Sequence, residues 1–198
     1  QHWVKMVAPP IPRRPMIRDS TFLIPKLSPG FEATVTLPGS KSIALRQLAI
    51  AALVEGSSYI TGIPKCDDTD AMIDCLRALG VVIDEGNSLI RITGPMDFGS
   101  AHVELNSRMS GASTRLLIAL AALRNGSTRI DGQESLRVRT NAPLFKGLRD
   151  NDCDVISDGG TLPAVILGGL TSNGPLYIDG SLSSQYITAL TVIAPILA

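Results

Sequence analysis

The stretch PGSKSIALRQLAIAALVEGSS, residues 38–58, places a polar, basic turn directly in front of an apolar helix. Residues 43–54 are apolar apart from Arg46 and Gln47, a composition typical of a helix that is buried on most sides. Lys41 and Arg46 nevertheless fall near the start of this helix. Cations there oppose the helix macrodipole, whose positive end lies at the N-terminus. We therefore expect an anion to lie close to this end of the helix.

The composition bounds the class of protein. The chain has 198 residues, 44% of them hydrophobic, which is enough for one large or two small globular domains. Its 18 basic and 18 acidic residues cancel, and only 4% of the residues are aromatic. A nucleic-acid surface normally shows a basic excess and stacking rings. The composition argues against nucleic acid and favours a charged small molecule as the partner.

The cysteines and the chain ends bear on the compartment. Cys66, Cys75 and Cys153 are odd in number and lack Cys-x-x-Cys spacing, which indicates neither a disulfide framework nor a zinc site. We expect inert, buried thiols in a reducing cytoplasm. No run approaches the roughly 18 to 20 apolar residues of a membrane span. Residues 1–30 are typical of an extended lead-in and lack a signal-peptide core. A cytoplasmic protein without a membrane segment is expected.

A repeated plan organises the rest of the chain. Residues 39–83 and 109–155 each show a small polar cluster, an arginine, an Ala/Leu-rich helix, a Gly-Ser turn, an Ile-x-Gly strand and an amphipathic helix containing Leu-Arg. A third copy begins near residue 180. Lys41 and Gly111 are 70 positions apart, and Gly111 and Ser183 are 72 apart. This period is typical of a small α/β unit repeated within one pseudo-symmetric domain.

The repeat predicts an α/β fold in which each unit is a strand, a buried helix, a strand, an amphipathic helix and paired strands. We place the repeats near residues 31–100, 101–170 and 171–198, about two and a half units. Residues 81–95 predict two strands around a Glu-Gly-Asn turn, and residues 164–169 and 175–180 predict short strands ended by glycine. Because residues 187–198 are apolar and uncapped, we expect the chain to be a fragment of a longer protein.

Each apolar helix begins with a small, hydroxyl-rich turn, at residues 40–42, 110–113 and 181–185. Each serine could be an ordinary N-cap. If pseudo-symmetry sets the helices side by side, however, their N-termini converge and present free N–H groups and hydroxyls to one place. The cations that would join them are Lys41, Arg46, Arg115 and Arg139. The expected ligand carries phosphate or several carboxylates.

Other phosphate and metal motifs are poorly supported. The Gly-x-x-x-x-Gly-Lys-[Ser/Thr] pattern of a P-loop is absent, and no Gly-x-Gly-x-x-Gly follows a strand. His2 and His102 are isolated, so a metal site or a Ser-His relay has little basis. The segment CDDTD, residues 66–70, precedes an amphipathic pattern, which favours helix capping and first-turn acids over a metal cluster. We expect no metal.

Four segments together resemble one family. LPGSKSIALR, SGASTRLL, DGQESLRVR and DGSLSSQYITAL are similar, in order and spacing, to the signature segments of the 5-enolpyruvylshikimate-3-phosphate (EPSP) synthase family of enolpyruvyl transferases, and they span residue 37 to the end. The sister enzymes acting on UDP-N-acetylglucosamine have a Lys-Asn pair where this chain has Lys41-Ser42. The resemblance implies an inside-out α/β barrel of βαβαββ units. Residues 31–198 would form an incomplete N-terminal domain, with a second domain outside this sequence.

The resemblance also implies a reaction. The 5-hydroxyl of shikimate 3-phosphate would attack C2 of phosphoenolpyruvate while C3 is protonated, and the adduct would then eliminate phosphate without a cofactor. Lys41 and Arg139 would be catalytic, and the complete enzyme would be a monomer. Carried over by motif, the residues that bind phosphoenolpyruvate would be Lys41, Gly111, Arg115, Arg139 and Gln185. Those that bind shikimate 3-phosphate would be Lys41, Ser42, Arg46, Ser183, Ser184 and Gln185.

Two departures and one omission leave alternatives open. Leu45 stands where the family usually has Asn or His, and Ala112 where it commonly has Thr, which would remove polar contacts near the charged residues. The family's proton-transferring residues lie beyond Ala198, so we predict that this chain alone does not turn over. The alternatives are an enolpyruvyl transferase with another acceptor and a non-catalytic anion-binding module.

Overall fold

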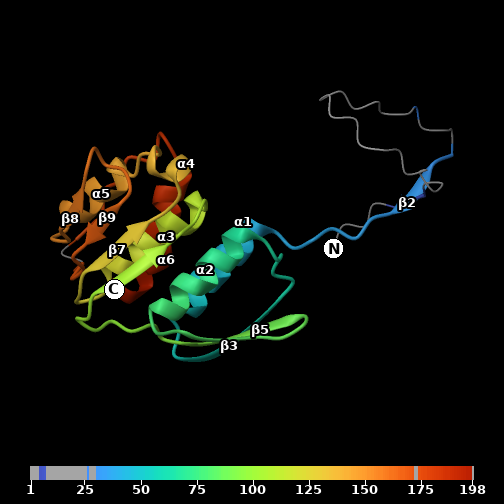
Figure 1. Cartoon of the computed structure of the whole chain (residues 1–198), viewed down its shortest axis with the longest axis horizontal. Helices are drawn as coiled ribbons and strands as arrows, with labels where there is room; N and C mark the ends of the chain where they lie inside the picture. Colours follow the sequence, from blue (N-terminus) through green and yellow to red (C-terminus); the bar gives the residue numbers. More distant parts are fainter. Residues whose placement is uncertain (1–4, 8–25, 27–29, 172–173, 198) are drawn as a thin grey trace. The chain divides into compact units, whose positions relative to one another are not determined.

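The computed structural model describes residues 5–7, 26, 30–171 and 174–197, and it divides the chain into a unit of residues 1–38 and a unit of residues 39–198 (Figure 1). In the first unit, β1 (Lys5–Val7) pairs antiparallel with β2 (Glu32–Thr34). The lead-in expected at residues 1–30 lies almost wholly outside the described residues. The second unit carries the core and every residue of the candidate site.

The first repeat of the larger unit is a helix, a strand, a helix and a hairpin. In order these are α1 (Lys41–Ala51), β3 (Gly56–Thr61), α2 (Asp67–Ala78), β4 (Val82–Glu85) and β5 (Leu89–Gly94). The sheet order is β3-β5-β4, antiparallel throughout. The hairpin predicted over residues 81–95 is confirmed.

The second repeat follows the same plan with one more strand and one more short helix. Its elements are β6 (Val103–Asn106), α3 (Gly111–Ala122), β7 (Thr128–Asp131), α4 (Glu134–Arg137), α5 (Ala142–Arg149), β8 (Val155–Ser157) and β9 (Ala164–Ile166). The sheet order is β6-β7-β9-β8, so β7-β9-β8 repeats the order of β3-β5-β4. Here β6 runs parallel to β7, whereas in the first repeat β2 pairs with β1 instead of β3.

A third apolar helix, α6 (Ser184–Leu197), follows the second repeat, but the strand predicted at residues 175–180 is wrong. A strand needs a neighbour to bond with, and none of the described sheets takes this segment in. Pro175 lacks an N–H to donate. The segment instead passes α5, where a Cβ on Gly147 would lie 3.6 Å from the Tyr177 carbonyl oxygen.

The core lies around α3, which packs against α1, α2 and α6 and against β7 and β9. Large apolar side chains from all three apolar helices are fully enclosed, among them Leu48, Leu117 and Ile193. Serines cap the N-termini of α1 and α3: Ser40 Oγ accepts from Ile43 N at 3.4 Å, and Ser110 Oγ accepts from Ser113 N at 3.3 Å. Gly39 must be glycine, because a Cβ there would collide with the Gly62 carbonyl oxygen.

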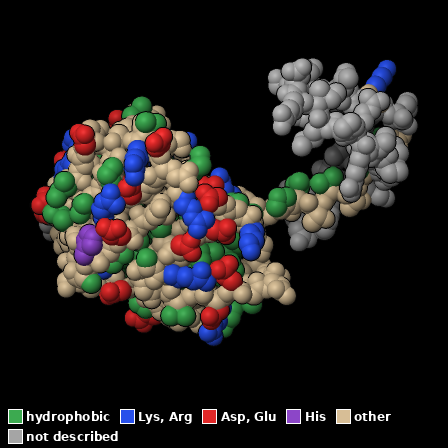
Figure 2. All heavy atoms as spheres, in the orientation of Figure 1, with side chains coloured by type: hydrophobic (Ala, Val, Ile, Leu, Met, Phe, Trp, Pro, Cys, Tyr) green, Lys and Arg blue, Asp and Glu red, His purple; other side chains and the backbone are tan. Residues whose placement is uncertain are grey.

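Among the described residues, no helix is both long enough and apolar enough to cross a membrane. On the face of the larger unit shown in Figure 2, acidic and basic side chains are interspersed rather than gathered by sign. Cys75 and Cys153 are free and buried, and burial raises the pKa of their thiols to about 12 and about 11. The prediction of buried thiols is thus confirmed for these two, whereas Cys66 is half-buried.

Candidate functional site

The starts of α1, α2 and α3 meet at Asp68. The Asp68 carboxylate pairs with Lys41, the first residue of α1, with 3.0 Å between Nζ and Oδ2. The hydroxyl of Ser113, in the first turn of α3, donates to the Asp68 carbonyl at 3.3 Å. Asp68 lies in the first turn of α2, so one residue links three helix N-termini. Each N-terminus contributes backbone N–H groups and the positive end of a dipole.

Asp68 supplies the anion that the sequence predicts near Lys41 at the start of α1. Burial raises the pKa of Asp68, but a hydrogen bond from Ser110 and the pairing with Lys41 outweigh it, so the net pKa lies below the usual range. The side chains are 27% and 50% exposed for Asp68 and Lys41, so the pair borders solvent. Lys41 can therefore exchange Asp68 for a dissolved anion, or hold both.

Arg115 is a buried cation, 8% exposed, without an acidic partner among the described residues. Its Nη1 donates to the Gly111 carbonyl at 2.7 Å and its Nη2 to the Thr140 carbonyl at 3.4 Å, while Nε is buried without a hydrogen-bond partner. The guanidinium carbon lies 5.8 Å from the ring centroid of Tyr186 on α6. A buried charge balanced only by carbonyl dipoles and a ring favours an anion nearby.

Gly111 and Arg139 lie beside this guanidinium. A Cβ on Gly111 would collide with Nη1 of Arg115 and would lie 3.2 Å from Nη1 of Arg139. Two guanidinium groups thus lie against the first residue of α3, where an added side chain would displace at least one of them. Arg139 follows the short helix α4 and is exposed, which leaves its charge accessible. Backbone donors and fork-shaped cations at one helix start suit a phosphate.

Ser42 and Arg46 form a second arrangement on α1. Arg46 Nη1 donates to the Ser42 carbonyl at 2.6 Å and to its Oγ at 2.5 Å. Arg115 donates to the carbonyl four residues earlier in the same way, so the two repeats hold their arginines alike. Arg46 also borders a groove of about 430 Å³ between α1 and α6, beside Ile187 and Thr191.

The predicted residues on α6 lie at its start. Ser183 Oγ accepts from Gln185 N at 3.2 Å, so Ser183 takes the ordinary capping role that the sequence left open. Ser184 is exposed, and Ser183 and Gln185 are half-buried. The next residue, Tyr186, donates its hydroxyl hydrogen to the Thr140 carbonyl at 2.8 Å, which ties this helix start to Arg115.

The two departures from the family pattern face the core. Leu45 is 1% exposed and packs within the hydrophobic core, and Ala112 is half-buried against it. Leu45 therefore presents almost no surface to a ligand. Its physical role is packing on the buried side of α1.

Some functional neighbours were missed by sequence reasoning. The segment CDDTD does start α2 with first-turn acids, but Cys66 is the N-cap, and Thr69 Oγ1 accepts from Cys66 N at 3.2 Å. Asp68 was not recognised as the partner of Lys41, nor Tyr186 as a neighbour of Arg115. A first-turn acid after a Lys-bearing helix start is the signal that could have suggested the first pair. Among the described residues no acidic, His and Cys cluster could hold a metal ion.

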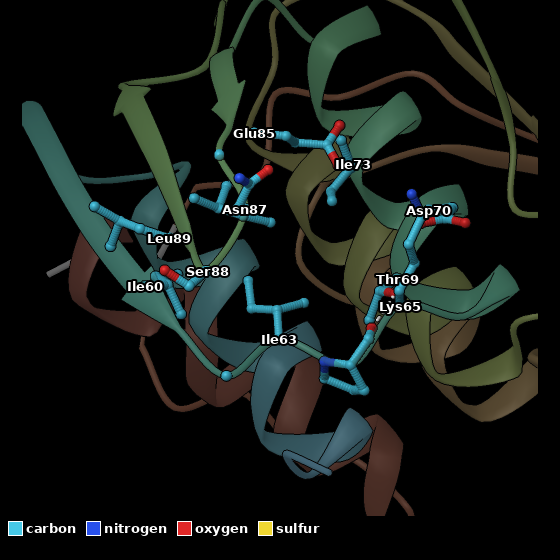
Figure 3. A pocket seen from close by; sticks show the side chains of 14 residues that line it. Ile60, Ile63, Lys65, Thr69, Asp70, Ile73, Glu85, Asn87, Ser88 and Leu89 are labelled. Atoms are coloured by element: carbon cyan, nitrogen blue, oxygen red, sulfur yellow. Dashed lines mark hydrogen bonds between the residues drawn. The ribbon is translucent and has the colours of Figure 1, made fainter.

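A cavity of about 530 Å³ lies between β3, α2 and the β4–β5 turn (Figure 3). Isoleucines 60, 63 and 73 are among its apolar residues, and Lys65, Asp70 and Asn87 are among its polar residues. None of the predicted site residues lines it. We locate the candidate site at the cationic helix starts instead, because that is where the charges needed to bind an anion lie.

Comparison with known proteins places this arrangement in a family. Residues 28–198 match the family model of EPSP synthase (3-phosphoshikimate 1-carboxyvinyltransferase). The chain is 42% identical over 159 residues to the 3-phosphoshikimate 1-carboxyvinyltransferase of Rhizobium etli (strain CIAT 652), covering 79% of this chain and 38% of that protein. To the same-named protein of Bordetella pertussis (strain Tohama I) it is 39% identical over 168 residues, covering 83% and 38%.

A solved structure agrees with the sequence matches. The EPSP synthase of Acinetobacter baumannii superposes with a TM-score of 0.68 at 27% identity, covering 80% of this chain and 37% of that one. The predicted α/β fold of enolpyruvyl-transferase type is thereby confirmed. The chain spans about 38% of the length of the curated relatives it matches. With most of its residues matched by the family model, the chain belongs to the EPSP synthase family.

Proposed function

We propose that this chain is part of an enzyme that transfers the enolpyruvyl group of phosphoenolpyruvate to the 5-hydroxyl of shikimate 3-phosphate, with release of phosphate, in aromatic amino acid biosynthesis. The observation that carries the proposal is the pair of guanidinium groups, Arg115 and Arg139, against Gly111 at the start of α3. Arg115 is buried there, and none of the acids that the structure describes pairs with it. The relatives' name supplies the reaction class.

The phosphate of phosphoenolpyruvate would bind at the start of α3. The Gly111 N–H and the Arg139 guanidinium would donate hydrogen bonds to its oxygens, and the buried charge of Arg115 beside Gly111 would attract it. Lys41 on α1 and Gln185 on α6 would provide the remaining contacts. Lys41 must leave Asp68 to do this, or bridge the two anions. A phosphate carries two negative charges where the Asp68 carboxylate carries one, so it attracts the Lys41 ammonium group more strongly.

Shikimate 3-phosphate would lie along α1 and the start of α6. Ser42 and Arg46 would take its carboxylate, and Ser183, Ser184 and Gln185 its 3-phosphate, with Lys41 between the two substrates. Arg46 would rotate from the Ser42 carbonyl to a carboxylate, a stronger acceptor that offers two oxygens to the guanidinium fork. The groove that Arg46 borders leaves room for this movement.

The chemistry asked of these residues is electrostatic. Two polyanions repel, and fixed cations overcome the repulsion and hold the reactants in place. As the tetrahedral adduct expels phosphate, charge grows on the departing oxygens, where Lys41 and Arg139 would stabilise it. These cations supply the charge that a metal ion would otherwise provide, so we propose no cofactor. The proton-transferring groups would come from outside this chain, which alone would not turn over.

The test is phosphate release by the complete open reading frame that encodes this chain. Release that requires both phosphoenolpyruvate and shikimate 3-phosphate supports the proposal. Release with phosphoenolpyruvate and a different acceptor would point to another enolpyruvyl transferase. A folded protein that binds phosphate but releases none with either acceptor would be an anion-binding module, and the proposed reaction would be rejected.

We further propose that the enzyme is cytoplasmic and monomeric and keeps Cys75 and Cys153 as thiols. Free, buried thiols fit a reducing compartment. Thiol counting on protein from untreated cells tests the reducing compartment and the thiols, and sedimentation of the complete protein tests the monomeric state. A disulfide in the isolated protein or a concentration-independent dimer would contradict them.

A further inference from the structure

Arg108 lies in the turn that precedes α3, and its backbone is unusual. Its φ is +51°, the left-handed region that residues other than glycine rarely occupy. Such a conformation persists where surrounding contacts over-determine it, and it is enriched at functional sites. The contacts of Arg108 are therefore informative about why an arginine stands here.

The side chain of Arg108 ties this turn to α2. Nη1 donates to Asp67 Oδ1 at 2.8 Å, and Nη2 donates to Asp74 Oδ2 at 2.5 Å. One guanidinium thus binds two aspartates that lie about two turns apart on α2, using the fork geometry that lysine lacks. Asp67 is adjacent to Asp68, the partner of Lys41, so these two hydrogen bonds fix the part of α2 that carries Asp68.

The backbone of Arg108 ties the same turn to the segment after β7. Its carbonyl accepts from Gln133 N at 2.8 Å, and its N–H donates to Asn106 Oδ1 at 2.9 Å. A Cβ on Gly132 would lie 2.7 Å from the Arg108 carbonyl oxygen, so the two loops pack at close range. The segment after β7 continues through α4 to Arg139.

Three segments therefore meet at Arg108, and each carries part of the candidate site. The start of α2 holds Asp68 and through it Lys41, the Arg108 turn leads to Gly111, and the segment after β7 leads to Arg139. We propose that Arg108 is a positioning residue that fixes the phosphoenolpyruvate end of the site without touching the ligand. The inference rests on the proposed function and names a residue outside the family motifs quoted above.

The test compares Arg108→Gly, Arg108→Lys and Arg91→Ala in the complete protein. Arg108→Gly removes the guanidinium while glycine accepts the left-handed backbone, which limits damage to folding. Arg91 is the control. Its Nε and Nη2 both donate to Asp84 Oδ2 at an exposed place, and neither residue belongs to the proposed site. We expect the KM for phosphoenolpyruvate to rise about tenfold in Arg108→Gly and to recover partly in Arg108→Lys.

The KM for shikimate 3-phosphate separates positioning from general damage. Its proposed contacts lie mostly on α1 and α6, which Arg108 does not touch, so we expect a change of less than about twofold in Arg108→Gly. A merely structural role would raise both KM values together or neither. Either of those results, or an equal effect of Arg91→Ala, would overturn the proposal.

A second readout does not depend on turnover. Inorganic phosphate is titrated into isotope-labelled protein while the Gly111 amide signal is followed by nuclear magnetic resonance. We expect the apparent Kd for phosphate to be about tenfold higher in Arg108→Gly than in the unsubstituted protein. If the complete protein binds phosphate but releases none from its substrates, the proposed function fails while this shift still supports positioning. An unchanged Kd, or no response of Gly111 in the unsubstituted protein, overturns the positioning role.

Discussion

Helices α1 and α3 occupy the same place in two repeats, yet their surroundings differ. Along α3 every residue except Ala112 is buried, whereas in α1 only Ala44, Leu45, Leu48, Ala49 and Ala51 are. Helix α3 lies among three helices and two strands, while one side of α1 opens onto the groove shared with α6. The same apolar pattern thus gives an enclosed helix in one repeat and a half-open one in the other.

The cations of the two repeats differ in the same way: that of the enclosed helix is held in place, and those of the half-open helix are free to move. Arg46 and Arg115 each donate to the carbonyl four residues earlier, but only Arg115 is also held by Thr140 and covered by Tyr186. Lys41 is half-exposed and paired with an exchangeable carboxylate. The second repeat therefore supplies a preorganised part of the site, and the first supplies groups that must move to meet a ligand.

The largest expected effect concerns the enclosure of α3. Arg124 follows this helix, is fully buried, and donates to the Asp97 and Ala101 carbonyls and to Thr128 Oγ1, each within 3.0 Å. Arg124→Met would leave two part-buried carbonyls and the buried Thr128 hydroxyl without this donor, and we expect a loss of about 3–5 kcal/mol of unfolding free energy. Urea unfolding measures it.

The matched control is Val54, which stands 70 positions earlier, three residues after the end of α1, and is 47% exposed. We expect Val54→Ala to cost no more than about 0.5 kcal/mol, as at an ordinary surface position. Equal losses at the two positions would contradict the contrast between the enclosed and the half-open helix.

The next effect concerns rate rather than stability. Lys41→Met and Arg139→Met each remove an accessible cation from the proposed phosphate site, and we expect kcat/KM to fall about 10²–10³-fold. Both side chains border solvent, so the unfolding free energy should change by less than about 0.5 kcal/mol. Phosphate release and urea unfolding of the complete protein measure the two quantities.

Lys65→Met is the control for these variants, since Lys65 is exposed and lies at the separate cavity near α2. It should retain activity within about twofold. Near-full turnover in Lys41→Met or Arg139→Met would remove the basis for assigning either residue to catalysis.

Local features of the site and fold could be predicted from the sequence, because the signals that define them are local. Apolar runs with serine caps located α1 and α3, and the Glu-Gly-Asn turn located the β4–β5 hairpin. The failures are non-local. The segment 175–180 has strand-like composition but none of the described sheets includes it, and Asp68 meets Lys41 across 27 residues. The left-handed backbone of Arg108 has no sequence signature at all, because arginine rarely adopts it.

A smaller effect tests how tightly the second repeat is preorganised. Gly111→Ala adds one methyl group where Arg115 and Arg139 lie closest, so at least one guanidinium must shift. Misplacement of a positioning group by about 1 Å can cost up to 10²-fold, and we expect a ten- to hundredfold fall in kcat/KM for phosphoenolpyruvate. Steady-state phosphate release at varied phosphoenolpyruvate measures it.

Gly147→Ala makes the same chemical change in α5, where the added Cβ would meet only ordinary contacts at 3.6 Å and beyond. We expect normal kinetics and a slight gain in stability, since alanine favours a helix over glycine by about 1 kcal/mol. If Gly111→Ala behaves like Gly147→Ala, the guanidinium groups tolerate displacement and the second repeat is less preorganised than its contacts suggest.

The smallest effect concerns the exchangeable pair of the first repeat. The folded-state pKa of Asp68 is lowered, since the hydrogen bond from Ser110 and the Lys41 charge outweigh the effect of burial. A lowered pKa stabilises the fold above the unfolded value near 3.9, and this contribution disappears as pH falls through the folded pKa. We expect Asp68→Asn to cost about 0.5 kcal/mol at pH 7, as a partly exposed pair should, and clearly less at pH 3.

Urea unfolding of both proteins at the two pH values measures this difference. An equal cost at pH 3 and pH 7 would show that Asp68 acts through hydrogen bonds that asparagine cannot make rather than through its charge. A cost well above 1 kcal/mol at pH 7 would mean that Lys41 is held firmly. Lys41 could then no longer exchange partners at little cost, and a ligand would have to displace a strong ion pair. The first repeat would in that case be as preorganised as the second.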